Sequence, residues 1–241
     1  MISYKPMSDK PSVRSPWFWV PSLYFAQGIP YVAVMIVSVL MYKRLGVSNT
    51  DIALYTSWLN LPWVIKPFWS PFVDLLKTKR WWVATMQLLI GAGLAGVAFT
   101  IPTTFFFQAS LAVFWLLAFS SATHDIAADG FYMLALDSHE QAFFVGIRST
   151  FYRIAIIAGQ GVLVMFAGFL ENSTGNIPLA WSVTFFILGG LFLALFLYHR
   201  YILPLPKGDK PSATVTPSTI LKEFFATFAS VSYTHLRAHE T

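Results

Sequence analysis

Cysteine is absent from this 241-residue sequence, so no disulfide framework, cysteine-ligated zinc site or thiol nucleophile can form. Charged residues are also few, at 11% of the chain. A soluble domain needs roughly a quarter of its residues charged to cover its surface with polar groups. Most of the outer surface must therefore face something other than water, which argues against a soluble globular protein.

Apolar residues, in contrast, make up 56% of the chain, and the mean hydropathy is +0.60. They gather in long runs separated by short polar breaks, and each run reaches the length of about 20 residues that a helix needs to cross a bilayer. The sequence thus predicts an all-α membrane protein, a six-transmembrane-helix bundle surrounded by the lipid bilayer. The expected spans are Trp17–Tyr42, Ile52–Leu76, Trp81–Ile101, Phe105–Leu136, Phe143–Leu170 and Pro178–Leu203.

The formal net charge of +5 does not indicate nucleic-acid binding, because most basic residues lie in the breaks between apolar runs. Cytoplasmic loops of membrane proteins carry an excess of Lys and Arg. On one side of the expected membrane only Lys43 and Arg44 are basic. The other side, which includes the N-terminus, is therefore predicted to be cytoplasmic. Its basic residues are Lys5, Lys10, Arg14, Lys77, Lys79, Arg80, Arg200, Lys207, Lys210 and Lys222.

Composition divides the chain into four parts. Residues 1–16 are expected to be a cytoplasmic N-terminus, and residues 17–203 the six-helix bundle. A stretch with several prolines follows, so residues 204–230 are expected to form a cytoplasmic linker and the start of a truncated second half. Residues 231–241, VSYTHLRAHET, look like translated sequencing-adaptor read-through and are interpreted as a non-native tail.

Ionisable residues inside membrane spans are costly, and by default they mark a transport pathway or an ion pair. Asp125 and Asp129 are four residues apart, so both carboxylates lie on one face of a helix. If the fourth and fifth spans form a hairpin around Asp137–Gln141, Asp129 lies level with Arg148 and Asp125 level with Arg153. We hypothesise two Asp–Arg pairs at two depths, with a purely structural role for these pairs as the alternative.

A buried ion pair is at best near break-even against a hydrophobic substitute, which favours a functional role for the deeper charges. Asp125 and Asp129 are predicted to couple proton uptake to transport. His124, next to Asp125, is predicted to be a titrating partner. An ordinary histidine at a helix interface is the alternative for His124.

Lys66 lies in a span with three prolines within ten residues, which should bend the helix. A cation on a bent helix facing a cavity suits an anionic substrate, and snorkelling of Lys66 to the headgroups is the alternative. Trp63 could stack on a sugar ring, although helix packing is the alternative. Gly28 and Pro30 are interpreted as an interruption of the first span, which makes Gln27 a hydrogen-bonding candidate in the cavity.

Four stretches carry a resemblance to a known family: Gly28–Pro30, Leu61–Asp74, Ala122–Asp129 and Gly146–Ile154. They resemble the major facilitator superfamily, and more narrowly its AmpG-like muropeptide permeases and the related acetyl-coenzyme A transporters. The superfamily signature between spans two and three, Gly-x-x-x-Asp-Arg-x-Gly-Arg-Arg, is degenerate here. Asp74 and Lys79 fit it and Arg80 follows, whereas both glycines are replaced. The resemblance implies an ion-pair gate of Asp74, Lys79, Arg80 and Arg148.

The resemblance also implies the N-terminal half of a twelve-span major facilitator fold in a bacterial inner membrane, with a missing C-terminal half as its partner. The expected function is proton-coupled import of a muropeptide-like or related glycan or anionic solute. Lys66, Arg153, Gln27 and Trp63 are then expected to bind the small-molecule substrate. Alternatives are another solute, such as an oligosaccharide or an acyl-coenzyme A, and a non-transporting scaffold. No cofactor or metal is expected, and an enzyme is disfavoured because no nucleophile–base pair is suitably spaced.

Overall fold

The computed structural model describes residues 15–211, and each regular element in this range is a helix. Elements labelled η are short 3-10 turns, except η2 and η5, which are π-helical. In chain order the elements are η1 (Pro16–Phe18), α1 (Val20–Val32), η2 (Ala33–Val37), α2 (Ser38–Arg44), α3 (Asn49–Thr56), η3 (Ser57–Asn60), α4 (Leu61–Ile65), η4 (Lys66–Phe68), α5 (Ser70–Leu76), α6 (Lys79–Thr100), α7 (Phe106–Ala135), α8 (Ser138–Ala158), η5 (Gly159–Leu163), α9 (Val164–Thr174) and α10 (Ile177–Ile202).

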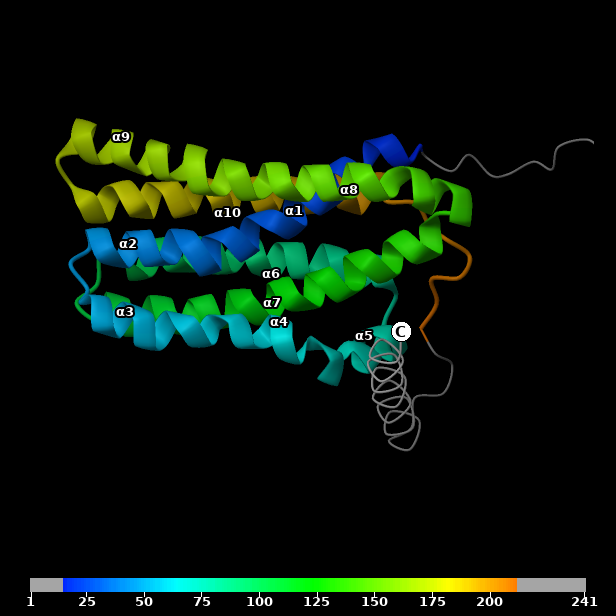
Figure 1. Ribbon diagram of the computed structural model, residues 1–241, viewed down its shortest axis with the longest axis horizontal. Coiled ribbons are helices and arrows are strands. Elements are labelled where there is room, and N and C mark those ends of the chain that lie inside the picture. Colours follow the sequence, from blue (N-terminus) through cyan, green and yellow to red (C-terminus); the bar gives the residue numbers. More distant parts are fainter. Residues whose placement is uncertain (1–14, 212–241) are drawn as a thin grey trace, which may run out of the picture.

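The helices run side by side along one long axis (Figure 1). Among the described residues, five helical stretches are long and apolar enough to cross a membrane. The predicted all-helical membrane bundle is therefore confirmed at this level, with five of its expected spans. The five stretches are Pro16–Arg44, Lys79–Thr100, Phe106–Ala135, Ser138–Thr174 and Ile177–Ile202.

The expected span Ile52–Leu76 is not one long helix but a broken run from α3 to α5. Its prolines lack the N–H that an α-helix requires, and the 3-10 turns η3 and η4 separate the short helices around them. The pieces nevertheless follow α7 from one end of the bundle to the other (Figure 1). The indole N–H of Trp69 donates a hydrogen bond to Thr123 Oγ1 at 3.2 Å, which ties this run to α7.

The interpretation that Gly28 and Pro30 interrupt the first span is wrong. Helix α1 continues through both residues to Val32, and the irregular turn is η2, which begins at Ala33. A second π turn, η5, separates α8 from α9, and the two π turns pack against each other.

Gly28 instead permits close packing of α1 on α8. A Cβ atom on Gly28 would stand 2.7 Å from the Cβ of Ala155 and 2.9 Å from the carbonyl oxygen of Tyr152. Small residues of this kind let helix backbones approach in membrane bundles. Helix α1 also packs on α7, whereas α7 and α8 have few contacts with each other beyond their connecting turn. Helix α1 therefore acts as a wedge between α7 and α8.

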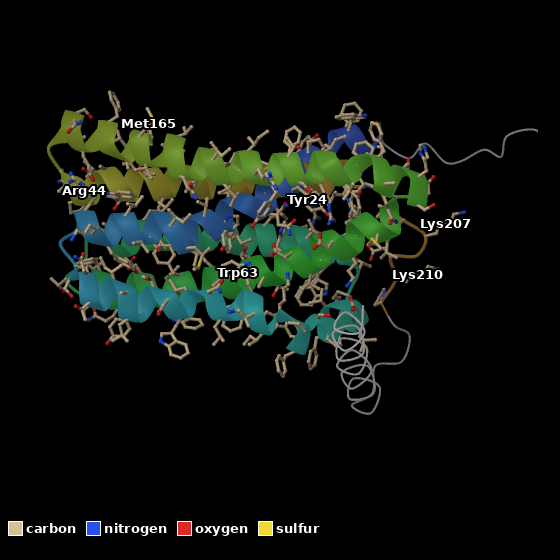
Figure 2. All side chains as sticks on the ribbon, in the orientation of Figure 1. Tyr24, Arg44, Trp63, Met165, Lys207 and Lys210 are labelled. Carbon is tan, nitrogen blue, oxygen red and sulfur yellow. The ribbon has the colours of Figure 1, made fainter. Side chains whose placement is uncertain are left out.

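The two ends of the bundle carry different polar groups. At one end Arg44 forms an ion pair with Glu171, and the indole N–H of Trp181 donates to Glu171 Oε1 at 2.7 Å. Figure 2 shows Arg44 at this end and Lys207 and Lys210 at the opposite end. These labelled basic residues therefore lie at the two ends to which the pattern of basic loops assigns them. That the second end faces the cytoplasm stays a prediction.

The proposed division of the chain stays a prediction as well. Residues 204–211 are described and return toward the start of α6. The rest of the expected linker, the expected tail 231–241 and most of the expected N-terminal segment lie outside the described residues, as do Lys5, Lys10, Arg14 and Lys222.

Replacing Gly28 with Ala should lower the midpoint of thermal unfolding of the detergent-purified protein. The added methyl group has no space against α8, and overpacking of this kind costs about 1–3 kcal/mol. Gly168→Ala on α9 is the matched control, because a Cβ there meets nothing within 4 Å and Ala favours a helix. Equal midpoints for the two variants would contradict the tight α1–α8 contact.

Candidate functional site

A cavity of about 420 Å³ lies between α1, α7 and α8. Several site residues predicted from the sequence line it, namely Gln27, Asp129, Arg148 and Arg153. The other lining residues are Tyr24, Ser149 and Tyr152. Figure 2 shows Tyr24, which belongs to α1, among the helices of the bundle. We call this space the central cavity.

One wall of the central cavity is a hydrogen-bonded cluster around Asp129. Arg148 Nη1 lies 3.3 Å from Asp129 Oδ1 and donates to the hydroxyl of Tyr24 at 3.0 Å. The Tyr24 hydroxyl in turn donates to Asp129 Oδ1 at 2.9 Å. The guanidinium group also lies over the rings of Tyr24 and Tyr132, with 5.2 and 5.0 Å to their centroids. The hypothesised Asp129–Arg148 pair is therefore present, with two tyrosines that sequence reasoning missed.

Asp125 lies one helical turn deeper on the same face of α7 and is only 7% exposed. Its carboxyl group interacts with the side chains of Gln27 and Trp63 and with the charge of Lys66. Oδ1 of Asp125 has no hydrogen-bond partner among the described residues. A carboxylate oxygen without a hydrogen-bond partner can bind a proton, and the resulting O–H group can then act as a donor. Asp125 thus differs from Asp129, whose charge is already paired.

Lys66 and Trp63 reach this region from the broken run. Lys66 begins η4, and its half-buried side chain interacts with the carboxyl group of Asp125. The Trp63 ring packs edge to face against Tyr31 of α1, with 5.2 Å between centroids. The 3-10 geometry next to the prolines therefore lets the indole of Trp63 and the charge of Lys66 act on the buried carboxyl group. Three separate parts of the chain meet at Asp125.

The second hypothesised pair, Asp125–Arg153, is absent. Arg153 lines the central cavity as an exposed side chain on α8, while Asp125 faces Gln27 and the broken run. Counting residues from the hairpin turn assumed that α7 and α8 stay adjacent. The helices diverge instead because α1 lies between them, so the count holds near the turn and fails deeper in the bundle.

His124 points away from Asp125 into a buried polar chain, which favours the alternative of a helix-interface histidine. Its Nε2 lies 3.1 Å from Nε2 of Gln87, and Gln87 Oε1 lies 3.0 Å from Nδ1 of His199. His199 Nε2 lies 3.0 Å from the hydroxyl of Ser22. Successive residues on a helix point about 100° apart, so one neighbour can face the cavity and the other a different interface. This row of hydrogen-bonded side chains could not be predicted from the sequence, because its members lie on four separate helices, α1, α6, α7 and α10.

The predicted gate residues lie at the end of the bundle where α6 begins. Lys79 forms an ion pair with Asp74, and its buried side chain runs across Gly130 of α7. Arg80 does not join that pair; its guanidinium group donates to the carbonyl oxygen of Arg200 instead. Arg148 belongs to the central cavity, so the structure does not bring the four proposed gate residues together.

The described residues contain no group of three or more His, Cys, Asp or Glu side chains that could hold a metal ion. The central cavity is lined by the side chains of Arg148 and Arg153 and by Gln27, which also interacts with the buried Asp125 next to the cavity. Charged and polar groups of this kind inside a membrane bundle by default mark a pathway or an ion pair.

The family model described as the BT1 family matches residues 25–231, which is most of the sequence. The chain belongs to the BT1 family. This BT1-family chain is 29% identical over 181 residues to “Putative transporter AmpG 4” of Rickettsia conorii, a match covering 71% of the chain and 41% of the relative. It is 28% identical over 153 residues to the anhydromuropeptide permease of Escherichia coli strain K12, covering 60% and 30%.

These similarities confirm the resemblance to AmpG-like permeases and support a transporter rather than an enzyme. They also support a multi-pass protein of a bacterial inner membrane. The BT1-family chain spans less than half the length of either relative. Its substrate, its coupling ion and the roles of its site residues stay predictions.

Replacing Gln87 with Leu should destabilise the protein, because His124 and His199 would both lose a buried hydrogen-bond partner. Each buried polar group left unpaired costs roughly 1–3 kcal/mol. The measurement is thermal unfolding in detergent, with Gln160→Leu at an exposed position as the control. An unfolding midpoint for Gln87→Leu as high as that of the control would show that these buried hydrogen bonds contribute nothing to stability.

Proposed function

We propose that this chain is the N-terminal half of a proton-coupled secondary transporter of the major facilitator type, which imports a muropeptide-like or related glycan or anionic solute. The observation that carries the proposal is the buried, incompletely bonded carboxyl group of Asp125 beside a cavity lined by cations. Charges are expensive inside a membrane, and such groups by default mark ion or substrate pathways. The relatives named as transporter and permease support the same class.

The broken run from α3 to α5 is proposed to be the sixth crossing. It extends along α7 over the length of the bundle (Figure 1). Its irregular turns lie where Trp63 and Lys66 meet Asp125, and interrupted helices are where transporters build substrate sites. With this crossing, the chain enters and leaves the bundle at the same end.

Each site residue has a proposed role that follows from its position. Lys66 and Arg153 attract the acidic groups of the substrate, and Gln27 and Trp63 supply a hydrogen-bonding amide and a stacking surface. Asp125 takes up the coupled proton. Asp129 is held by Arg148 and Tyr24, so its proposed part in coupling requires that pair to open. His124, which faces Gln87, has no direct part.

A second half is proposed to complete the site. The central cavity is open on one side in this chain, and Arg153 lies exposed on its rim. In transporters built from two such halves, the substrate lies near the membrane midplane at their interface. The second half would supply the facing wall, and rocking of the halves would expose the cavity to either side in turn. The proposed orientation places the N-terminus in the cytoplasm.

Another solute, such as an oligosaccharide or an acyl-coenzyme A, would use the same cavity and coupling. The interaction of the buried Asp125 with Gln27 and with the charge of Lys66 is the feature that disfavours a non-transporting scaffold. A scaffold has no need of partly satisfied charges in its interior, because apolar packing is at least as stable.

Asp125→Asn in the full-length protein should abolish proton-driven accumulation of an anhydromuropeptide while preserving exchange of labelled for unlabelled solute. The amide keeps the shape of the carboxyl group but cannot bind and release a proton. Uptake into cells and counterflow in proteoliposomes measure the two activities. A protonophore should reduce the wild-type protein to the level of the variant. Accumulation that survives both treatments would contradict proton coupling at Asp125.

Lys66→Gln should raise the KM for an anionic solute by roughly tenfold or more, since a charged partner in a dry site contributes on the order of 1.5–3 kcal/mol. Lys66→Arg should retain most of the affinity. Lys43→Gln, at an exposed position at the far end of the bundle, is the control for loss of one charge. Unchanged KM in Lys66→Gln would support snorkelling of Lys66 to the headgroups instead.

A further inference from the structure

A second polar feature lies away from the central cavity, between α6 and α10. A groove of about 340 Å³ opens there, at the end where α6 begins and α10 ends. We call it the basic groove. Its principal lining residues are Arg80, Trp81, Leu88, Phe196, Arg200 and Leu205. It shares no lining residue with the central cavity.

The basic groove is a consequence of how α6 and α10 cross. A Cβ on Gly91 would stand 3.2 Å from the carbonyl oxygen of Gly189, and a Cβ on Gly189 would stand 3.0 Å from that of Gly91. The backbones therefore nearly touch at this level. The helices pack along much of their length, so the shape of the groove is set by rigid elements.

Polarity changes along the groove in one direction. Arg80, Ala84 and Leu88 follow one another at intervals of four residues, so they form one stripe along α6. On α10, Phe196 lies one turn deeper than Arg200, and the Arg80 guanidinium group donates to the Arg200 carbonyl oxygen. Cationic groups thus lie at the helix ends and apolar side chains lie further into the membrane span. This gradient matches that of a phospholipid.

Several basic side chains lie at the mouth of the groove. Besides the two arginines, Lys77 lies over the ring of Trp81, with 5.9 Å from Nζ to the centroid. Among the described residues that line the groove, Asp209 is the one acid. Its two carboxylate oxygens accept the first two backbone N–H groups of α6, at 2.6 and 3.0 Å. Asp209 therefore closes the helix end, and Arg200 has no ion-pair partner among the described residues.

We propose that the basic groove binds an anionic phospholipid, with the phosphate at Arg80 and Arg200 and an acyl chain along Leu88 and Phe196. Helices α6 and α10 are both candidate membrane spans, so lipid is the solvent at this groove. Basic pockets between transmembrane helices bind anionic headgroups, and Trp81 has the position of an interfacial aromatic residue. A soluble phosphate would use the charged end alone and leave the apolar length empty.

Native mass spectrometry of the detergent-purified chain can test this proposal, with phosphatidylglycerol as the anionic lipid and phosphatidylcholine as the comparison. The wild-type chain should retain phosphatidylglycerol at lower lipid concentration. R80Q/R200Q should weaken that binding by roughly tenfold or more, since each basic residue near an anionic surface contributes about a factor of five. K207Q/K210Q is the matched control, because it removes two charges at the same end from residues that do not line the groove.

A third variant separates lipid from free phosphate. L88W fills the apolar part of the groove and keeps both arginines, so it should weaken binding of phosphatidylglycerol but not that of glycerol 3-phosphate. R200Q alone, at an exposed position, gives the charge test should the double variant fail to fold. Equal loss in K207Q/K210Q would overturn the proposal in favour of general surface charge. Unaltered lipid binding in L88W, or full displacement of lipid by glycerol 3-phosphate, would overturn it in favour of an anion site.

Discussion

The contact between α1 and α8 at Gly28 determines the layout of the candidate site. Because Gly28 lacks a side chain, α1 lies directly against Ala155 and the backbone at Tyr152, and so occupies the space between α7 and α8. The same helix presents Tyr24 and Gln27 to the two carboxyl groups of α7. A side chain at position 28 would push α8 away from α1 and so move Tyr152 and Arg153 away from Gln27. Helix α1 thus keeps the carboxyl group of Asp125 separate from Arg148 and Arg153 of α8.

Two carboxyl groups on one helical face consequently have different surroundings. Asp129 is half exposed and is engaged by a guanidinium group and a hydroxyl. Asp125 is buried, and one of its oxygens is without a partner among the described residues. Its carboxyl group interacts with an amide and an indole and with the charge of Lys66. In a membrane interior, a charge without full compensation is costly, so small changes around Asp125 shift its balance between charged and neutral forms. A transporter can use that balance.

The sequence predicted the helices well, since each long span is apolar, and predicted the Asp129–Arg148 pair because both residues lie near a short turn. It failed for Asp125–Arg153, since no count along the chain reveals a third helix between two others. Tyr24, Gln27 and Tyr31 recur at helical spacing and could have been recognised as one face. The Gln87–His199 contact could not, because it joins residues 112 positions apart. The prolines correctly indicated an irregular second span but not where its turns would place Lys66.

The π turns η2 and η5 lie side by side in the first and fifth spans. A π turn contains one residue more than an α-helical turn, and each residue advances an α-helix by about 100°. The part of each span beyond its π turn is therefore rotated with respect to a regular continuation of the helix. Because the two turns are adjacent, both outer segments are offset at the same level. Deleting one residue from η2 alone would rotate α2 with respect to α9, and deleting one from η5 alone would rotate α9 with respect to α2. The packing between these segments is therefore best preserved when both π turns are kept.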